Sequence, residues 1–160
     1  MATPVDLTTL DIASLAVLAG DSAARAVLAS MGGEGHGDVR ASHGYVFQRL
    51  IDAEPTIGEL AASLGITQQG ASKHVVELER LGYAERVADA ADQRVRRVRM
   101  TAAGRATLEA GRTARASLEQ RLLAAYGARD VATARRVLLG VLDLTGDTAR
   151  VAARQAPLPG

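Results

Sequence analysis

The 160-residue sequence has no cysteine, no tryptophan and only four other aromatic residues, one phenylalanine and three tyrosines. The absence of cysteine excludes disulfides, thiolate metal ligands, cysteine nucleophiles and thiol-based redox sensing. With so few aromatic side chains, the core has to be built from leucine, valine, isoleucine and alanine. Small aliphatic side chains of this kind favour close packing between helices.

The sequence also lacks a long apolar run and a leader pattern. No apolar run reaches about 18 residues, the length that indicates a membrane-spanning helix. Residues 1–6 contain no basic region ahead of an apolar stretch, which a secretory signal requires. The sequence therefore predicts a soluble, cytoplasmic protein without membrane contact.

Positive and negative charges nearly balance, with 19 lysine and arginine residues against 18 aspartate and glutamate residues and a formal net charge of +1. Their distribution is uneven, because residues 66–105 carry eight basic and five acidic side chains. A local basic strip of this kind suits neutralisation of nucleic-acid phosphates. The alternative interpretation is a charged edge strand that prevents unwanted strand pairing.

Hydrophobic periodicity predicts six helices and one β-hairpin. The predicted helices cover residues 8–31, 42–53, 57–64, 68–81, 102–125 and 130–153, and the predicted strands cover 83–87 and 95–100. Thr8 and Asp130 are predicted N-caps, and the Tyr126-Gly127 pair separates the last two helices. We expect the tail from Ala156 onward to be frayed.

Two short helices form a predicted helix-turn-helix between Thr56 and Leu81. Thr56 and Glu59 have the spacing of a capping box, in which each side chain bonds to the other residue's backbone N–H. Gly65 suits the left-handed position that ends a helix, and Ala61 is small where the two helices would cross. Two short helices joined by a glycine-containing turn are typical of this motif.

The second helix of the motif carries a polar face near its N-terminus. Glutamine amides match the edge of adenine in the major groove, and serine and lysine bind phosphates or base edges. The alternative interpretation is an ordinary solvated face of an amphipathic helix. The residues of this segment that we predict to contact DNA are Thr67, Gln68, Gln69, Ser72 and Lys73.

The hairpin supplies a second group of predicted DNA contacts, Asp92, Arg94 and Arg96. The Asp92 carboxylate can hold the Arg94 guanidinium through paired hydrogen bonds, and a pre-aimed arginine suits the negative potential of a narrow minor groove. The alternative is an exposed ion pair that contributes little to stability. We expect the hairpin arginines and the polar helix face to form one continuous cationic surface.

Motifs for catalysis are missing from the sequence. It contains no nucleophile elbow, no phosphate-binding loop and no paired carboxylates in an apolar setting, so we predict neither an enzyme nor a cofactor. His36 lies near Glu34, Asp38 and His43 in the sequence, and these residue types can bind zinc. The segment is rich in glycine, whereas a structural site needs rigid spacing. We therefore predict no metal site, although the sequence does not decide whether His36 and His43 bind a metal.

The segments Thr56–Tyr83, Asp89–Arg94 and Val98–Thr101 resemble the MarR family of bacterial winged-helix regulators. The resemblance implies a mainly α fold with a small β-hairpin wing, in which helices at both chain ends form a homodimer. It implies an N-terminal dimerisation helix with a glycine-rich loop at 1–40, a winged helix-turn-helix DNA-binding domain at 41–101 and C-terminal dimerisation helices at 102–160.

The resemblance also implies ligands. One is duplex DNA with a palindromic operator, contacted in the groove by the polar helix residues and at the wing by Asp92 and Arg94. The wing departs from a frequent family pattern, since Ala90 replaces a common proline and Gln93 a common basic residue. The other is a small, commonly phenolic or anionic effector, for which plain core packing is the alternative interpretation. The positions of this sequence that match the family's effector site are Leu15, Leu18, His43, Val46, Phe47, Met100 and Leu108.

The sequence thus predicts a dimeric, sequence-specific regulator of transcription that binds double-stranded DNA, with a repressor released by an effector as the favoured form. The alternative is a winged-helix module for protein–protein contacts without DNA binding. A gel-shift titration against salt distinguishes the two, because only DNA binding produces a shift that weakens steeply as salt rises.

Overall fold

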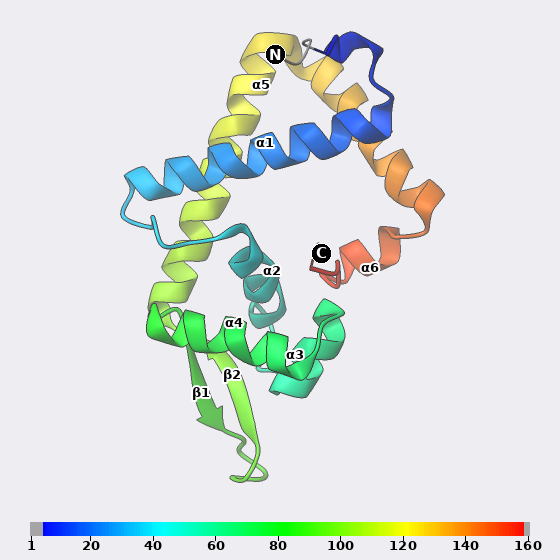
Figure 1. Cartoon of the computed structure of the whole chain (residues 1–160). Helices are drawn as coiled ribbons and strands as arrows, with labels where there is room; N and C mark the ends of the chain where they lie inside the picture. Colours follow the sequence, from blue (N-terminus) through cyan, green and yellow to red (C-terminus); the bar gives the residue numbers. More distant parts are fainter. Residues whose placement is uncertain (1–4, 159–160) are drawn as a thin grey trace.

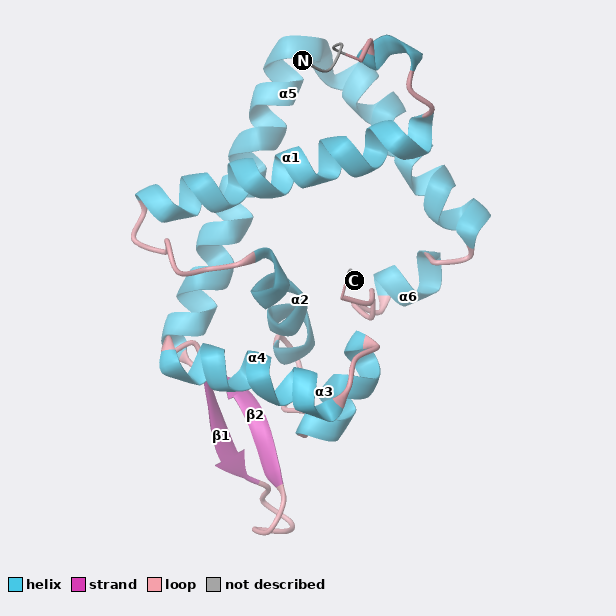
Figure 2. Ribbon diagram, viewed as in Figure 1, coloured by secondary structure: helices cyan, strands magenta, loops and turns pink. Residues whose placement is uncertain are grey.

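The computed structural model describes residues 5–158 and is mostly helical, with one antiparallel hairpin (Figure 2). After a 3-10 turn at Leu7–Thr9, the elements are α1 (Ile12–Gly33), α2 (Ala41–Leu50), α3 (Ile57–Leu64), α4 (Gln68–Arg80), β1 (Ala84–Ala88), β2 (Arg96–Met100), α5 (Ala102–Thr145) and α6 (Thr148–Ala152). The predicted winged helix-turn-helix fold is confirmed, and the corrections concern helix ends and the tail.

One hydrophobic core holds α2, α3, α4, the hairpin and the start of α5 together. Leu60, Leu64, Val75, Leu78 and Val98 are completely buried at its centre. Full burial of such a side chain contributes about 1.5–3 kcal/mol, so the cluster fixes α4 relative to the hairpin. The hairpin projects from this unit at the end of the molecule farthest from the bend of α5 (Figure 1).

The helix-turn-helix begins and turns where the sequence predicts. Thr56 Oγ1 accepts the Glu59 N–H at 3.2 Å, and Glu59 Oε2 accepts the Thr56 N–H at 2.7 Å. Gly65 ends α3 in the left-handed conformation with φ of 69°. Thr67 then caps α4 by accepting the Gly70 N–H. These local bonds set the direction in which α4 leaves α3.

The hairpin is anchored to the segment that precedes α3. β1 and β2 pair in antiparallel register, with Ala84 opposite Met100. Thr56 forms a bridge to Arg97, and the Val98 N–H donates to the Pro55 carbonyl at 2.8 Å. Each strand begins one residue later than predicted. The base of the wing is therefore held by the same residues that start α3.

α5 bends at Gly127, where φ of 78° and ψ of 161° interrupt the helix, as the Tyr126-Gly127 pair predicts. The prediction that Asp130 caps a separate helix is wrong, because helical structure resumes directly after Gly127. The helix also stops before residue 153, since Gly146 adopts the left-handed conformation with φ of 77°. The short α6 forms beyond that turn.

α1 crosses the first half of α5 (Figure 1) and packs against it through its C-terminal third. Val27 and Met31 are buried there with Ala114 of α5. The predicted N-cap is wrong. The carboxylate of Asp11 caps α1, accepting the N–H three residues on at 2.9 Å, whereas Thr8 lies in the preceding 3-10 turn. Most of the remaining surface of α1 is exposed.

α1 is long and apolar enough to cross a membrane by length and composition, with a mean hydropathy of 1.5 over an 18-residue window. The expectation that no uninterrupted apolar run reaches about 18 residues still holds, because charged residues interrupt this window. Asp21 and Arg25 lie in the middle of the helix, and charged residues are costly inside a bilayer. An exposed apolar surface of this kind also suits contact with another protein.

The C-terminal segment docks onto the helix-turn-helix, so the prediction of a frayed tail is wrong for residues 156–158. Arg49 Nη2 donates to the Ala156 carbonyl at 2.6 Å and to the Ser63 carbonyl at 2.8 Å. The Leu158 N–H donates to the Leu64 carbonyl at 3.1 Å, which satisfies an acceptor at the end of α3. Residues 159–160 of the predicted tail lie outside the described residues.

Candidate nucleic-acid interface

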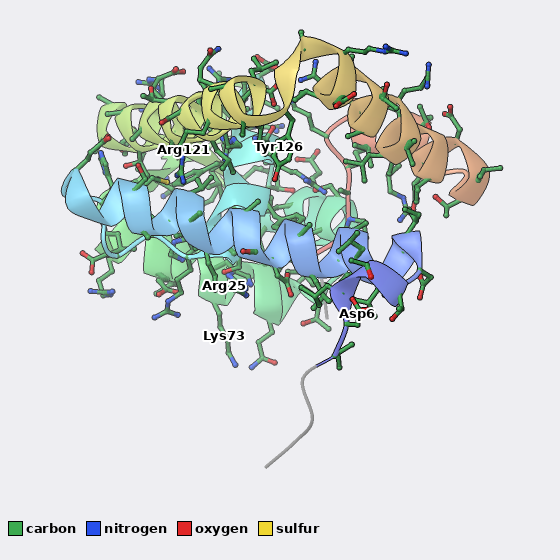
Figure 3. All side chains as sticks on the ribbon, turned by 90° about the horizontal axis from the view of Figure 1, so that it is seen from above. Asp6, Arg25, Lys73, Arg121 and Tyr126 are labelled. Carbon is green, nitrogen blue, oxygen red and sulfur yellow. The ribbon has the colours of Figure 1, made fainter. Side chains whose placement is uncertain are left out.

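The N-terminal half of α4, with its cap, presents the polar residues that the sequence predicts for DNA contact. Gln68, Gln69 and Lys73 are exposed, and Figure 3 shows Lys73 extending outward from α4. The Thr67 hydroxyl accepts a backbone N–H of the first turn at 3.1 Å, so its first role is to start the helix. Ser72 is half-buried. The structure therefore places four of the five on one helix and the fifth at its cap.

Val76 and Arg80 extend this surface toward the end of α4, and the sequence analysis missed them. They line one groove together with Gln69, Ser72, Lys73 and Glu77. Val76 is 52% exposed, although valine is usually buried. A branched apolar side chain at that place suits contact with the methyl group of thymine. Val76 follows Ser72 by four residues and Lys73 by three, and Arg80 follows Val76 by four, which is the signal that would have found them.

The hairpin arginines divide between its two faces, because successive residues of a strand point in opposite directions. Arg96 shares a face with the buried Val98, whereas Arg97 and Arg99 lie on the other face. The expectation of one continuous surface containing all the hairpin arginines is therefore wrong. The alternation of arginine with apolar residues, from which the sequence predicts strand β2, already implies that its arginines point to two faces.

Arg86 connects the wing to α4, a role that the sequence analysis did not assign. It stands opposite Val98 in the ladder, on the face turned toward α4. Its guanidinium nitrogens lie 3.5 Å from Ser72 Oγ and 3.5 Å from Glu79 Oε2. Ser72 is thus oriented by a residue of the wing.

Ion pairs neutralise the two arginines on the outer face of the hairpin. Arg97 bonds to Asp89 through Nε. Arg99 Nη2 donates to Glu85 Oε1 at 2.9 Å, directly across the ladder. Paired guanidinium groups have less to gain from releasing counterions around a phosphate. These two side chains are therefore poorer candidates for DNA contact than their number in the sequence indicates.

Arg94 and Arg96 are exposed at the wing and have no ion pair among residues 5–158. The same is true of Lys73 and Arg80 on α4 within that range. On α4 and the wing, these four side chains are the cations that the described structure leaves available for phosphates. The sequence predicted three of the four.

The predicted side-chain pair between Asp92 and Arg94 is absent from the described contacts. Asp92 Oδ1 instead accepts the backbone N–H of Arg94 at 2.9 Å. The reason is local, since an aspartate readily bonds to the N–H two residues later in an Asx turn. Asp92 thus fixes the backbone at the wing tip and leaves the Arg94 guanidinium available for a phosphate or a groove.

A buried histidine of α2 faces α4. His43 is completely buried, its Nδ1 accepts the Arg40 N–H at 3.2 Å, and its Nε2 lies 3.5 Å from Glu77 Oε2. Glu77 also pairs with Arg40 at 3.1 Å. Burial lowers the pKa of His43, and the neighbouring Glu77 opposes this shift in part. An acceptor at Nδ1 requires the neutral ring.

The free energy of unfolding should therefore fall as pH drops below about 6.5, the ordinary histidine pKa. Below that pH the unfolded chain binds a proton at His43 that the folded chain does not bind. The free energy of unfolding then falls by up to about 1.4 kcal/mol per pH unit. In His43→Asn, an amide oxygen replaces the Nδ1 acceptor without titrating. Urea unfolding at a series of pH values should show a shallower acid loss for this variant than for the wild type. An equal loss of stability with falling pH in the two proteins would show that His43 is not the group responsible.

The residues matched to an effector site separate into two groups. Five are at most 8% exposed and fill the interior of the winged helix, namely His43, Val46, Phe47, Met100 and Leu108. Leu15 and Leu18 are instead 39% and 50% exposed on α1. Core packing accounts for the burial of the first five.

The two histidines of the glycine-rich region have separate partners. His36 Nδ1 lies 3.2 Å from Thr107 Oγ1 of α5, whereas His43 faces Glu77. Over the described part of the chain, no group of three or more histidine, aspartate or glutamate side chains is placed to hold a metal ion. The zinc alternative therefore has no ligand set there.

Comparison with known proteins gives one family. The model of the MarR family matches residues 38–95, from just before α2 to the wing. The resemblance that the sequence analysis drew from the helix-turn-helix and wing is confirmed for this segment. No curated protein sequence matches the chain.

Solved structures share the fold over most of the chain. The reduced form of MarR from E. coli has a TM-score of 0.68 and 23% identity, over 83% of this chain and 97% of that one. FabT of Streptococcus pneumoniae in complex with DNA gives 0.64 and 18%, over 82% and 94%. A MepR variant of S. aureus bound to an oligodeoxyribonucleotide gives 0.61 and 19%, over 85% and 99%.

Proposed function

We propose that this chain, which belongs to the MarR family through residues 38–95, is a homodimeric regulator of transcription that binds double-stranded DNA sequence-specifically. The observation that carries the proposal is the link between two DNA-suited surfaces. The polar face of α4 and the wing are joined by Arg86 beside Ser72. The structures of FabT and of the MepR variant, which have a similar fold, contain DNA.

The two surfaces have different tasks in this proposal. Gln68, Gln69 and Ser72 read base edges in the major groove, because amides and hydroxyls can both donate and accept there. Arg94 and Arg96 bind phosphates or a narrow minor groove, which adds affinity with little sequence information. A module built only for protein contacts has no need for this combination of exposed amides and unpaired cations.

The proposed dimer follows from exposed apolar side chains on the two long helices. Leu18 of α1 is 50% exposed, and Leu138 and Leu139 of α5 are 51% and 53% exposed. Large apolar side chains left exposed on two long helices are typical of an interface. A two-fold dimer would present two α4 helices, which must lie about 34 Å apart to enter successive major grooves of a palindromic site.

Repression with release by an effector is the form of regulation that we propose. A small molecule bound between α1 and the winged helix would change the separation of the two α4 helices and so reduce affinity for the operator. Leu15 and Leu18 are the exposed members of the predicted effector positions. Screening for compounds that lower operator binding and raise the melting temperature tests this part independently.

Arg94→Ala should weaken binding to every duplex about tenfold or more, since it removes a charge-assisted contact. The slope of log affinity against log salt should fall in magnitude by about 0.9, the value for one lost phosphate contact. The measurement is a fluorescence-anisotropy titration at several salt concentrations, on a duplex selected by the wild-type protein from a random pool. No binding by the wild type at any salt concentration would refute the proposed function.

The matched control is Gln69→Ala on the groove face of α4. It should leave the salt slope unchanged and alter the base preference at one position of each half-site, by about 1–3 kcal/mol. Selection from the random pool with the variant measures that preference. An unchanged preference would remove Gln69 from the base-reading set while leaving the phosphate assignment of Arg94 in place.

A further inference from the structure

Arg97 contacts three separate segments of the described chain. Its Nε bonds to Asp89, its Nη1 donates to the Glu54 carbonyl at 3.0 Å, and Nη1 also lies 3.5 Å from Glu59 Oε2. These partners belong to the wing loop, the segment before α3 and the first turn of α3. A single guanidinium therefore joins the wing to the start of the helix-turn-helix.

The contact continues from Asp89 to the tip of the wing. Asp89 Oδ1 accepts the Ala91 N–H at 2.7 Å and the Asp92 N–H at 3.2 Å. Asp92 in turn accepts the N–H of Arg94 at 2.9 Å. The bond from Arg97 also holds the pKa of Asp89 below its ordinary value. A chain of two carboxylates thus runs from Arg97 to the backbone of Arg94.

Arg97 is badly placed to meet DNA itself. It lies on the opposite face of β2 from Arg96, and its charge is already matched by Asp89 and Glu59. The side chain is only 34% exposed. A guanidinium in this setting would have to break existing charge-assisted bonds before it could bind a phosphate.

We propose that Arg97 is a positioning residue that sets the angle and order of the wing, and thereby the place at which Arg94 and Arg96 meet DNA. This inference rests on the proposed function for its effect on DNA binding. Its structural part stands without DNA, because the network closes entirely within the protein. The sequence analysis grouped Arg97 with the general basic strip, and it gave the ordering role to Asp92 alone.

The test uses Arg97→Met, which keeps much of the apolar stem and removes the charge and the donors. Hydrogen exchange of the free protein should become faster at residues 89–95. Affinity for the selected duplex should fall about tenfold or more, with the salt slope equal to that of the wild type. Arg94→Ala provides the contrast, since its slope falls by about 0.9. A similar slope change in Arg97→Met would make Arg97 a phosphate contact and overturn the proposal.

Two further variants separate positioning from simple charge. Arg97→Lys keeps the charge but not the planar fork that reaches Asp89 and the Glu54 carbonyl together, so it should reproduce most of the loss. Asp89→Asn should loosen the same wing residues, and combining it with Arg97→Met should add little, because both variants remove the Arg97–Asp89 ion pair. Full rescue by lysine, or unchanged exchange in the wing, would overturn the proposal. If the wild type binds no DNA, the proposed function fails while the exchange data still decide the role of Arg97.

Discussion

Gly104→Ala is expected to destabilise the protein by about 2 kcal/mol or more, which corresponds to a fall of roughly 4–8 °C in melting temperature. Gly104 lies in the first turn of α5, where the helix packs against the start of β1. A methyl group at this position would lie 2.1 Å from the Tyr83 carbonyl oxygen and 2.7 Å from Met100 Cγ. Both distances are far inside van der Waals contact.

The Tyr83 carbonyl, which would clash with the added methyl group, is held in place by hydrogen bonds around it. It accepts the Thr101 N–H at 3.1 Å, and the Thr101 hydroxyl donates to the neighbouring Gly82 carbonyl at 2.6 Å. Alanine gains about 1 kcal/mol over glycine in a helix interior. The clash should exceed that gain, because relief requires moving the backbone where α5 meets the hairpin.

The matched control is Gly44→Ala in α2, where an added methyl group meets no atom within 4 Å. There the helix-propensity gain should act alone and raise the melting temperature slightly. Thermal unfolding of both variants at one protein concentration keeps any effect of the proposed dimerisation equal between them. A variant at Gly104 as stable as the wild type would mean that α5 does not approach Tyr83 this closely.

The parts of the fold that follow from local chemistry could be predicted from the sequence. The capping box of Thr56 and Glu59 and the left-handed Gly65 depend on residues within a few positions of one another. The bend at Gly127 and the alternation of β2 are equally local. Such features need only a spacing and a residue type, so they determine where the candidate site lies.

Features that depend on competition among partners could not be predicted in the same way. Asp89 and Asp92 are both close in sequence to arginines, and only the folded hairpin decides that Asp89 takes the guanidinium of Arg97. The docking of Ala156 onto Arg49 joins residues 107 positions apart. No spacing rule relates such positions, because their contact depends on the bend of α5 and the turn after it.

The apolar surface of α1 is the remaining feature that one chain by itself does not explain. Leu15 is 39% exposed and Leu18 is 50% exposed, although burying a leucine stabilises a protein by about 1.5–3 kcal/mol. In a two-fold dimer the same residue is buried on both protomers. Burying the exposed fractions of both leucines on both protomers could therefore contribute about 3–5 kcal/mol to association, against the roughly 8 kcal/mol of a micromolar dimer.

Leu15→Glu combined with Leu18→Glu should therefore dissociate the protein into monomers at micromolar concentration, as sedimentation velocity would show. Each monomer would engage one half-site, so binding to a palindromic duplex should weaken by a factor of about 10²–10⁴ through loss of the linked second contact. Binding to an isolated half-site should change little, because the variant leaves α4 and the wing intact. Ala24→Glu, at an exposed position about 120° or more around the same helix from both leucines, is the control and should remain dimeric. If the double leucine variant also remains dimeric, the dimer interface lies elsewhere and α1 has lost its proposed role.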